Sequence, residues 1–463
     1  MKGAIYMNNS KRLSAAVIAV CTVLSSAVSC SSKKKDSSNK QPVTEAQTSD
    51  ENNDILGSDA EPSENMEITW LADFDLNPVE GEQRSVALSL FEDVYGGKIN
   101  YVYAAPEEKY STLSAMIDSG ETVDMFPYEA GIFPDGVLRG YFAPLDPYFE
   151  ELGMDSGIWD EMPPVTDMLA YNGQHYVMPY SISAPVLVTY SRKLMQSEGI
   201  DDPRKLWQEG KWDWNAMKSM TEKFRANNPD ASRYGINGWY GQAAINSTGH
   251  TVVGFDGSAL KNNIADPEVA KAIGLINDVS ANSWYNGTYH DTFPSDLNSL
   301  FFVSGSWTLG ISNAANPEAD LMIVPFPKSP DADKNYVSCN INSRLLVNVS
   351  DKGSAVAAYL RCERLAASET KYQNAAKAEA TAVRKNQSGS FRSFITEEQY
   401  DALMEYTDLS KVTPVLEFGN GMEKSMADNV MSRITDTSRE KDWEAEKKEL
   451  SPAIDAEIAK YNS

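Results

Sequence analysis

The sequence predicts an α/β fold built on an open, mostly parallel sheet, in a chain long enough for two lobes. β-rich runs at 67–71, 99–103 and 123–126 alternate with apolar residues at helical spacing over 87–94 and 110–117. This order is typical of an open parallel sheet, whose ligands sit beyond the carboxyl ends of the strands. A single core stops growing at about 250 to 300 residues, so a chain of 463 residues implies two lobes.

The composition is that of an ordinary globular protein, with 42% hydrophobic, 10% aromatic and 23% charged residues. Lys and Arg number 41 and Asp and Glu number 66, which gives a formal net charge of −25. A field of that sign repels nucleic-acid phosphates and anionic lipid headgroups. We therefore expect no nucleic-acid partner and no electrostatic docking on a membrane.

The first 30 residues have the pattern of an export signal. Three basic residues precede an apolar stretch over 13–28 that is too short to span a bilayer comfortably. The stretch ends Ala-Val-Ser-Cys30, which resembles the lipobox of bacterial lipoproteins, where the cysteine is acylated and becomes the mature N-terminus. The resemblance predicts a signal peptide over 1–29, a lipid anchor on Cys30 and a location at the extracellular face of the cell membrane. Secretion with ordinary cleavage stays open.

The segment from Cys30 to residue 66 is predicted to be a disordered tether. It is rich in Ser, Asn, Asp, Glu and Pro and offers almost nothing to bury. Chain statistics would then set its reach, and it would lift the folded body from the membrane surface.

Two cysteines remain in the body of the chain. Cys362 lies on an apolar helical face with Ala355, Ala358 and Leu365, so we expect a small buried thiol there. Export permits a disulfide between Cys339 and Cys362, but spacing alone does not show one.

The absence of common catalytic and metal-binding motifs from the sequence favours a binding protein over an enzyme. His175, His250 and His290 stand in no metal-ligand spacing, and no nucleophile elbow, P-loop or dinucleotide-binding glycine motif is present. Residues 331–335 begin like a calcium loop, but Tyr336 occupies the position that requires glycine, so we interpret them as a polar turn. We expect no metal and no cofactor. A glycoside hydrolase needs only two carboxylates, and this alternative stays open.

Five segments of the chain carry a family resemblance. The longest is YVMPYSISAPVLVTYSRKLMQSEGIDDPRKLWQEGKWDWNAMKSM at 176–220. LMIVPFPKSP at 321–330 and VNVSDKGSAVAAYLRCERLAAS at 347–368 are the next best matches. SGETVDMFPYEAG at 119–131 and SLFFVSGSWTLGIS at 299–312 match more loosely. In their order, these segments resemble the bacterial extracellular solute-binding proteins of the maltose-binding type, over essentially all of residues 67 to 463.

The resemblance implies a periplasmic-binding-protein-like fold of type II, with two lobes that are each an open, mostly parallel sheet flanked by helices. The first lobe would comprise 67–183 and 344–405, and the second 187–340 and 408–463. The resemblance also implies hinge crossings between the lobes, one ligand in the cleft, and closure around it. An ABC permease and its ATPase subunits, which are other chains, would receive the ligand from a monomeric protein.

The candidate ligand-binding residues combine aromatic rings with polar side chains. A sugar needs aromatic platforms for the C–H faces of its ring and carboxylates, amides or arginine for its hydroxyls. Both kinds stand in the loops at 72–78 and 127–131, which follow the first and third strands, and in segments that the family uses for ligand contacts. Trp212 and Trp214 are assigned to structure, while Glu417 and Phe418 could also reach the cleft. The predicted ligand-binding residues are Asp73, Phe74, Asp75, Phe126, Tyr128, Glu129, Tyr180, Ser183, Trp239, Tyr240, Trp307 and Arg344.

These features predict a lipid-anchored extracellular receptor that captures a carbohydrate, and the many aromatic candidates favour an oligosaccharide. The same scaffold could instead bind a non-sugar solute such as a peptide or a polyamine. A cleft dominated by carboxylates without tryptophan would favour the polyamine. A surface sensory or adhesion protein, which would use an exposed apolar patch, is a further alternative.

A disordered tether has a direct test. Limited proteolysis of the mature protein should cut between Ser31 and Glu64 and leave a resistant body, because unpaired backbone is open to proteases. Mass spectrometry of the fragments would locate the cuts. A tether that survives as long as the body does would contradict the prediction.

Overall fold

The computed structural model describes residues 65–80, 83–183, 185–229, 233–285, 293–383 and 394–461. The predicted signal peptide, the tether up to residue 64 and Cys30 lie outside these residues. Within the described part of the chain, none of the helices combines the length and the apolar character that a membrane crossing requires.

The chain divides into two compact units, and each is described by itself. The boundaries of the lobes inferred from the family resemblance stay a prediction. Unit 1 comprises Met1–Pro127, Pro147–Ile158 and Leu346–Ala376, and unit 2 comprises Tyr128–Asp146, Trp159–Leu345 and Lys377–Ser463.

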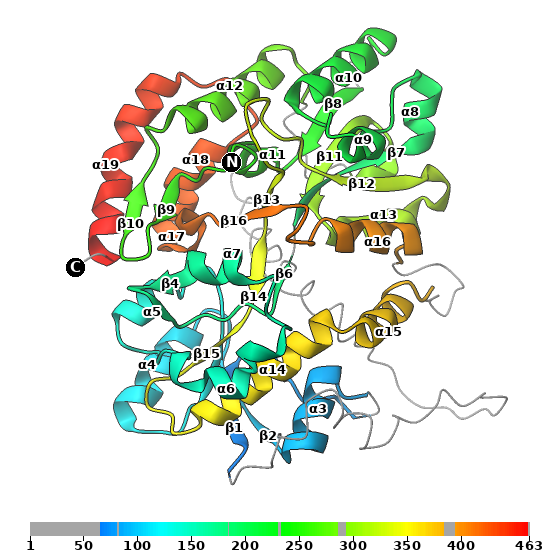
Figure 1. The fold of residues 1–463 in the computed structure, drawn as a ribbon. Helices are drawn as coiled ribbons and strands as arrows, with labels where there is room; N and C mark the ends of the chain where they lie inside the picture. Colours follow the sequence, from blue (N-terminus) through cyan, green and yellow to red (C-terminus); the bar gives the residue numbers. More distant parts are fainter. Residues whose placement is uncertain are drawn as a thin grey trace, which may run out of the picture. The chain divides into compact units, whose positions relative to one another are not determined.

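The sheet of unit 1 confirms the predicted alternation of strands and helices. Strands β1 and β2 pair in parallel, with Ile68 opposite Ile99, and β3 pairs in parallel with the other side of β1. The sheet order is β15-β3-β1-β2 (Figure 1). The elements are β1 (Glu67–Ala72), α3 (Val86–Tyr95), β2 (Lys98–Tyr103), α4 (Lys109–Ser119), β3 (Met125–Pro127), α6 (Phe149–Leu152), β15 (Arg344–Leu346) and α14 (Gly353–Ser368).

Helix α3 begins and ends at residues that are typical of helix termini. The Ser85 side chain accepts a hydrogen bond from the Leu88 amide at the start of α3, and Gly96 ends the helix at φ +65°. Helix α14 packs on α3, with the Phe91 and Tyr359 rings edge to face at 5.3 Å. Cys362 on α14 is fully buried, which confirms the prediction of a buried thiol.

The third strand is shorter than its apolar pattern suggests. The Asp124 side chain, rather than a backbone carbonyl, accepts the hydrogen bond of the Thr69 amide on the neighbouring strand. The buried Asp124 carboxylate accepts hydrogen bonds from the Thr69 amide at 2.7 Å and from the Ser350 hydroxyl at 2.6 Å. One side chain therefore joins β1 to the turn that precedes α14.

The main sheet of unit 2, of order β12-β7-β11-β8, is mixed, and the expectation of a mostly parallel sheet is wrong here because β7 runs antiparallel to both of its neighbours. Strand β11 is parallel to β8 and antiparallel to β7, and β7 is antiparallel to β12. Helices α8, α10, α13 and α16 pack on these strands (Figure 1). The elements are β7 (Val186–Ser191), α8 (Arg192–Glu198), α9 (Pro203–Gln208), α10 (Trp214–Asn227), β8 (Tyr234–Gly238), α11 (Tyr240–Asn246), α12 (Pro267–Ala281), β11 (Ser299–Gly305), α13 (Trp307–Ala315), β12 (Leu321–Pro325), α16 (Glu397–Glu405) and α19 (Trp443–Tyr461).

Two tryptophans at the start of α10 join it to strand β12 and to the end of α11. The Trp212 indole donates to the Pro325 carbonyl at 2.8 Å, and the Trp214 indole donates to the Ser247 hydroxyl at 3.1 Å. Both rings are buried, as their assignment to structure predicted.

Short strand pairs make up the rest of unit 2. Strand β14 pairs antiparallel with β6, and β13 pairs in parallel with β16. Two hairpins, β4–β5 and β9–β10, lie elsewhere in the unit. Their bounds are β4 (Ala170–Tyr171), β5 (Gln174–His175), β6 (Ser181–Ser183), β9 (Val253–Phe255), β10 (Leu260–Asn262), β13 (Tyr336–Ser338), β14 (Asn340–Asn342) and β16 (Thr413–Val415).

The two cysteines of the body form no disulfide with each other. Cys339, after β13, and Cys362, in α14, are both free thiols and both buried. The pairing that export would have permitted is therefore absent from the structure.

Candidate ligand-binding site

The strongest candidate site in unit 2 is a pair of tryptophans at one edge of its sheet. Strands β8 and β11 are parallel neighbours, with Gly238 opposite Val303, so both end at the same edge. Trp239 follows β8, and Trp307 begins α13 just after β11. Their ring centroids lie 6.0 Å apart with 47° between the planes, and both side chains are half-buried. The structure thus brings together two residues that the sequence singled out separately.

Local backbone geometry fixes the first of these tryptophans. The Trp239 amide donates to the Val303 carbonyl at 2.8 Å. Gly238 has φ +93°, and a Cβ added there would lie 2.0 Å from the same carbonyl oxygen. Only glycine is compatible with this close approach, so Gly238 sets the direction in which the chain presents Trp239.

Tyr240, the neighbouring candidate, lies inside unit 2. Its side chain is fully buried and packs edge to face on Tyr285 at 5.8 Å. Burial raises the pKa of the Tyr240 phenol. Trp239 is partly exposed while Tyr240 contributes to packing, and a ligand contact of Tyr240 stays a prediction.

A second group of candidates surrounds the short strands β6 and β14 in unit 2. The Arg344 guanidinium lies 5.5 Å from the centre of the Tyr180 ring, a cation–π distance, and both residues are largely buried. Ser183 pairs with Asn340 in the β6–β14 ladder. The Tyr128 amide donates to the Ser343 carbonyl at 3.2 Å, and Glu129 follows it, half-buried.

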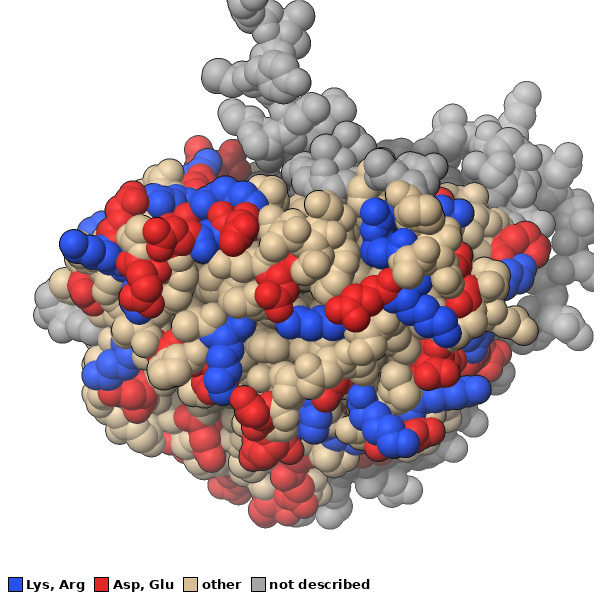
Figure 2. Space-filling view, turned by 90° about the horizontal axis from the view of Figure 1, so that it is seen from above, with Lys and Arg blue, Asp and Glu red and all other residues tan. Residues whose placement is uncertain are grey.

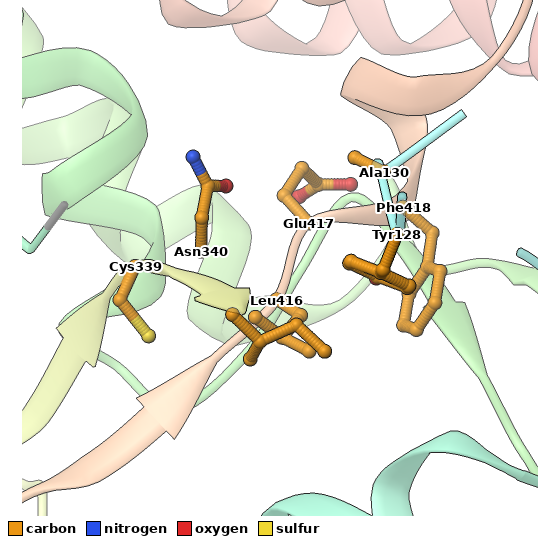
Figure 3. Close-up of a pocket in the computed structure, with 8 residues that line it drawn as sticks. Tyr128, Ala130, Cys339, Asn340, Leu416, Glu417 and Phe418 are labelled. Atoms are coloured by element: carbon orange, nitrogen blue, oxygen red, sulfur yellow. The ribbon is translucent and has the colours of Figure 1, made fainter. Parts of the chain in front are cut away.

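A small pocket lies beside these strands (Figure 3). Its volume is about 30 Å³, the space of a water molecule, whereas ligand pockets hold about 300 to 1,000 Å³. This pocket is therefore too small for a sugar ring. Its lining residues are Tyr128, Ala130, Cys339, Asn340, Ile341, Leu416, Glu417 and Phe418.

Glu417, which lines this pocket, accepts hydrogen bonds from four N–H groups. Its carboxylate accepts hydrogen bonds from the Val252 amide at 2.7 Å, the Val253 amide at 2.8 Å, the Gly419 amide at 3.1 Å and the Gln242 side chain at 3.3 Å. Burial raises the pKa of Glu417 to about 7, although the four donors act in the opposite direction. The side chain therefore ties the start of β9 to the turn after β16.

An aromatic group that the sequence did not reveal lies close to Glu417. The Phe255 ring, at the end of β9, lies 5.2 Å from Phe133 and 5.7 Å from Phe418, and Tyr171 lies nearly parallel to it at 6.4 Å. Phe418 had been named only as a residue that could reach the cleft. The others are far apart in the sequence and carry no common local pattern, so only the tertiary fold shows the group.

Unit 1 holds the other four candidates, which differ in exposure. Phe126 is fully buried against Tyr110, with ring centroids 5.8 Å apart. The Phe74 ring packs edge to face on Trp70 at 5.5 Å, and Asp75 is exposed and accepts a hydrogen bond from the Asn77 amide. The fourth candidate, Asp73, forms an ion pair.

Lys109, which is not among the predicted ligand-binding residues, is the partner of Asp73. Its ammonium nitrogen lies 2.9 Å from the Asp73 carboxylate, and both side chains are buried. Its position in the sequence could have indicated it. Lys109 stands at the start of the helix that follows the second strand, and this position lies at the same edge of the sheet as Asp73.

Charges of both signs share the surface of the protein. Figure 2 shows basic side chains beside acidic ones over much of one face. In unit 2, Lys271 lies 2.6 Å from Glu268 and 2.9 Å from Asp331. Among the residues that the structure describes, no group of His, Cys, Asp and Glu side chains could hold a metal ion.

The raised pKa of Glu417 predicts a pH-dependent stability. Between about pH 4.5 and 7 the folded state holds a proton that the unfolded state has lost, so the free energy of unfolding should fall as pH rises through this window. The full effect is about 3 kcal/mol, from about 1.4 kcal/mol per pKa unit. Chemical denaturation of the wild type and of Glu417→Gln at several pH values would measure it.

The Glu417→Gln variant cannot titrate at this position, so its stability should fall less over the same pH window. It should also lose about 1 to 3 kcal/mol at all pH values, because its amide group would face N–H donors. Glu318→Gln, on an exposed glutamate, is the control and should keep the wild-type slope. Equal slopes in all three proteins would contradict the raised pKa.

Solved structures of binding proteins share this fold. The sugar-binding protein MalE from Xanthomonas citri superposes with a TM-score of 0.62 at 13% identity, over 85% of this chain and 98% of that one. The cyclic α-maltosyl-1,6-maltose binding protein of Arthrobacter globiformis gives 0.58 at 14% identity, over 85% and 99%. UgpB from Mycobacterium tuberculosis, solved with glycerophosphocholine, gives 0.55 at 14% identity, over 81% and 94%. These similarities confirm the predicted fold class.

Sequence comparison places the chain in a family. Among curated proteins, none is similar enough in sequence to count as a relative. The family model of bacterial extracellular solute-binding proteins, however, matches residues 87–382, more than half of the chain. The prediction of a solute-binding protein is confirmed. With the solute-binding fold and this family match together, the chain belongs to the bacterial extracellular solute-binding proteins.

Proposed function

We propose that this protein captures a saccharide outside the cell membrane and delivers it to an ABC importer. The observation that carries the proposal is the pair of half-buried tryptophans, Trp239 and Trp307, at the carboxyl edge of the unit 2 sheet. Ring faces of this kind suit the C–H faces of a sugar, and the sheet edge is where ligands of α/β proteins bind. A site for a polyamine would instead be dominated by carboxylates.

The similar structures support a saccharide without deciding which one. The ligands bound in these structures include cycloalternan, β-1,6-galactobiose and acarbose, and one receptor has an exclusive preference for β-D-galactopyranose. The proposed ligand is an oligosaccharide, because two adjacent indoles offer more stacking area than a single ring needs. The remaining predicted contacts, among them Tyr180, Arg344 and Asp73, would supply the hydrogen bonds.

We also propose that Cys30 carries the lipid anchor and that residues up to 66 tether the body to the membrane. The support is the lipobox-like sequence and the polar composition of the segment after it. An anchored receptor of this kind stays beside its permease, so that captured solute is not lost by diffusion.

A non-sugar solute is the second candidate. UgpB, which has the same fold, was solved with glycerophosphocholine, so the scaffold accepts a phosphodiester. Aromatic ring faces also bind a quaternary ammonium group such as that of choline, so glycerophosphocholine belongs in the same binding test as the saccharides.

A thermal-shift screen of residues 66–463 tests the proposed function. The panel is galactose, β-1,6-galactobiose, acarbose and cyclic α-maltosyl-1,6-maltose, with glycerophosphocholine, a tripeptide and spermidine as the non-sugar arm. A ligand at about 100 times its Kd stabilises the native state by about 2.7 kcal/mol, so the midpoint should rise with at least one saccharide. A rise with a non-sugar solute alone would overturn the saccharide and leave the binding function intact.

Replacing the tryptophans tests their role directly. Trp239→Ala or Trp307→Ala should weaken binding of the saccharide with the largest shift by about 1 to 3 kcal/mol, because each removes a stacking face. Titration calorimetry measures this, and the stability of the unbound protein should barely change. Trp212→Ala is the control, since a buried indole should cost about 3 to 5 kcal/mol of stability. If all three variants lost the same stability in the unbound state, Trp239 and Trp307 would be core residues rather than ligand contacts.

A further inference from the structure

A buried ion pair lies at the carboxyl edge of the unit 1 sheet. Asp73 is the first residue after β1, and Lys109 is the first residue of α4, which follows β2. Strands β1 and β2 are parallel neighbours, with Ala72 opposite Tyr103, so both loops leave the sheet at this edge (Figure 1). Lys109 Nζ lies 2.9 Å from Asp73 Oδ1, with 2% and 7% of the two side chains exposed.

Stability alone does not explain this pair. Taking two charges out of water costs more than their attraction reliably returns, and a neutral apolar pair in the same space is often at least as stable. Lys109 also begins a helix, where the partial positive charge of the aligned peptide dipoles disfavours a cation. Violations of local rules of this kind are expected at functional sites.

The residues around the pair hold the loop after β1 in place. The Trp70 indole, on β1, donates to the Phe74 carbonyl at 2.9 Å, and the Asp75 carboxylate accepts a hydrogen bond from the Asn77 amide. Burial, and then the charges of Asp75 and Asp73, raise the pKa of Tyr101. Asp73 therefore belongs to a loop that two hydrogen bonds hold in place.

An exposed pair on the same two strands offers a contrast. Lys98 Nζ lies 3.4 Å from Glu67 Oε1, with 58% of both side chains exposed. This pair joins the amino ends of β1 and β2, away from the edge where ligands bind. A pair whose only task was to join the two strands would need no burial.

We propose that Lys109 is a positioning residue for ligand binding: it holds the Asp73 carboxylate in one orientation, so that Asp73 can accept a hydrogen bond from a ligand hydroxyl. The contact with Lys109 uses one carboxylate oxygen of Asp73, and the second oxygen can accept a further hydrogen bond. The inference rests on the proposed function, because it takes Asp73 as a contact for a hydroxylated ligand.

Three variants separate positioning from support of the fold. Lys109→Met removes the cation and leaves Asp73 buried and unpaired. Asp73→Asn/Lys109→Met removes both charges and should recover the thermal midpoint that the single variant loses. Glu67→Gln/Lys98→Met, on the exposed pair, is the matched control.

Two measurements decide the result. The first is the Kd for the saccharide of the panel that shifts the wild type most. We expect Lys109→Met and the double variant at Asp73 to bind about tenfold or more weakly, as for loss of a charge-assisted hydrogen bond, while the control binds as the wild type does. The second is hydrogen exchange of residues 73–77, which should speed up in Lys109→Met and not in the control.

Recovery of the midpoint without recovery of affinity in the double variant supports positioning. Wild-type affinity in either Lys109 variant would overturn it, and so would unchanged exchange of 73–77 in Lys109→Met. If the wild type binds no saccharide of the panel, the proposed function fails on that result alone. The exchange of 73–77 then decides the role of Lys109 by itself.

Discussion

Two neighbouring parallel strands end at the same edge of their sheet, and this constraint determines which loops of the protein lie together. In unit 2 it makes Trp239 and Trp307 neighbours, because β8 and β11 run in the same direction. In unit 1 it brings Asp73 and Lys109 together at the ends of β1 and β2. The register matters as much as the direction, since a slip of one residue would turn every side chain of a strand to the other face.

The sequence predicted the fold where local patterns carry the information. The alternation of strands and helices in unit 1 was correct because apolar spacing and helix ends such as Ser85 and Gly96 are local signals. Burial of individual aromatic residues was harder to predict. Trp239 and Tyr240 are adjacent and both aromatic, yet one is partly exposed and the other is fully buried, because Gly238 turns the chain between the strand and α11. The aromatic group around Phe255 depends on contacts between distant segments, which no local pattern records.

Two buried carboxylates are compensated in different ways. Asp73 has a full cation, Lys109, as its partner. Glu417 has only the partial charges of N–H groups from Val252, Val253, Gly419 and Gln242. Burial raises the pKa of Glu417 to about 7, and the four donors offset only part of that effect. Glu417, with its raised pKa, therefore lies where the start of β9 is hydrogen-bonded to the turn after β16.

The burial of the two body cysteines has a practical consequence. Burial raises the pKa of Cys339 to about 12 and raises that of Cys362 as well, so both stay protonated and react slowly with oxidants and alkylating reagents. Residues 66–463 contain no other cysteine. A single cysteine introduced on the surface of this body would thus be the fast-reacting thiol. One fluorophore could be attached there without modifying Cys339 or Cys362. A fluorophore attached in this way would make the protein an optical sensor of its own solute.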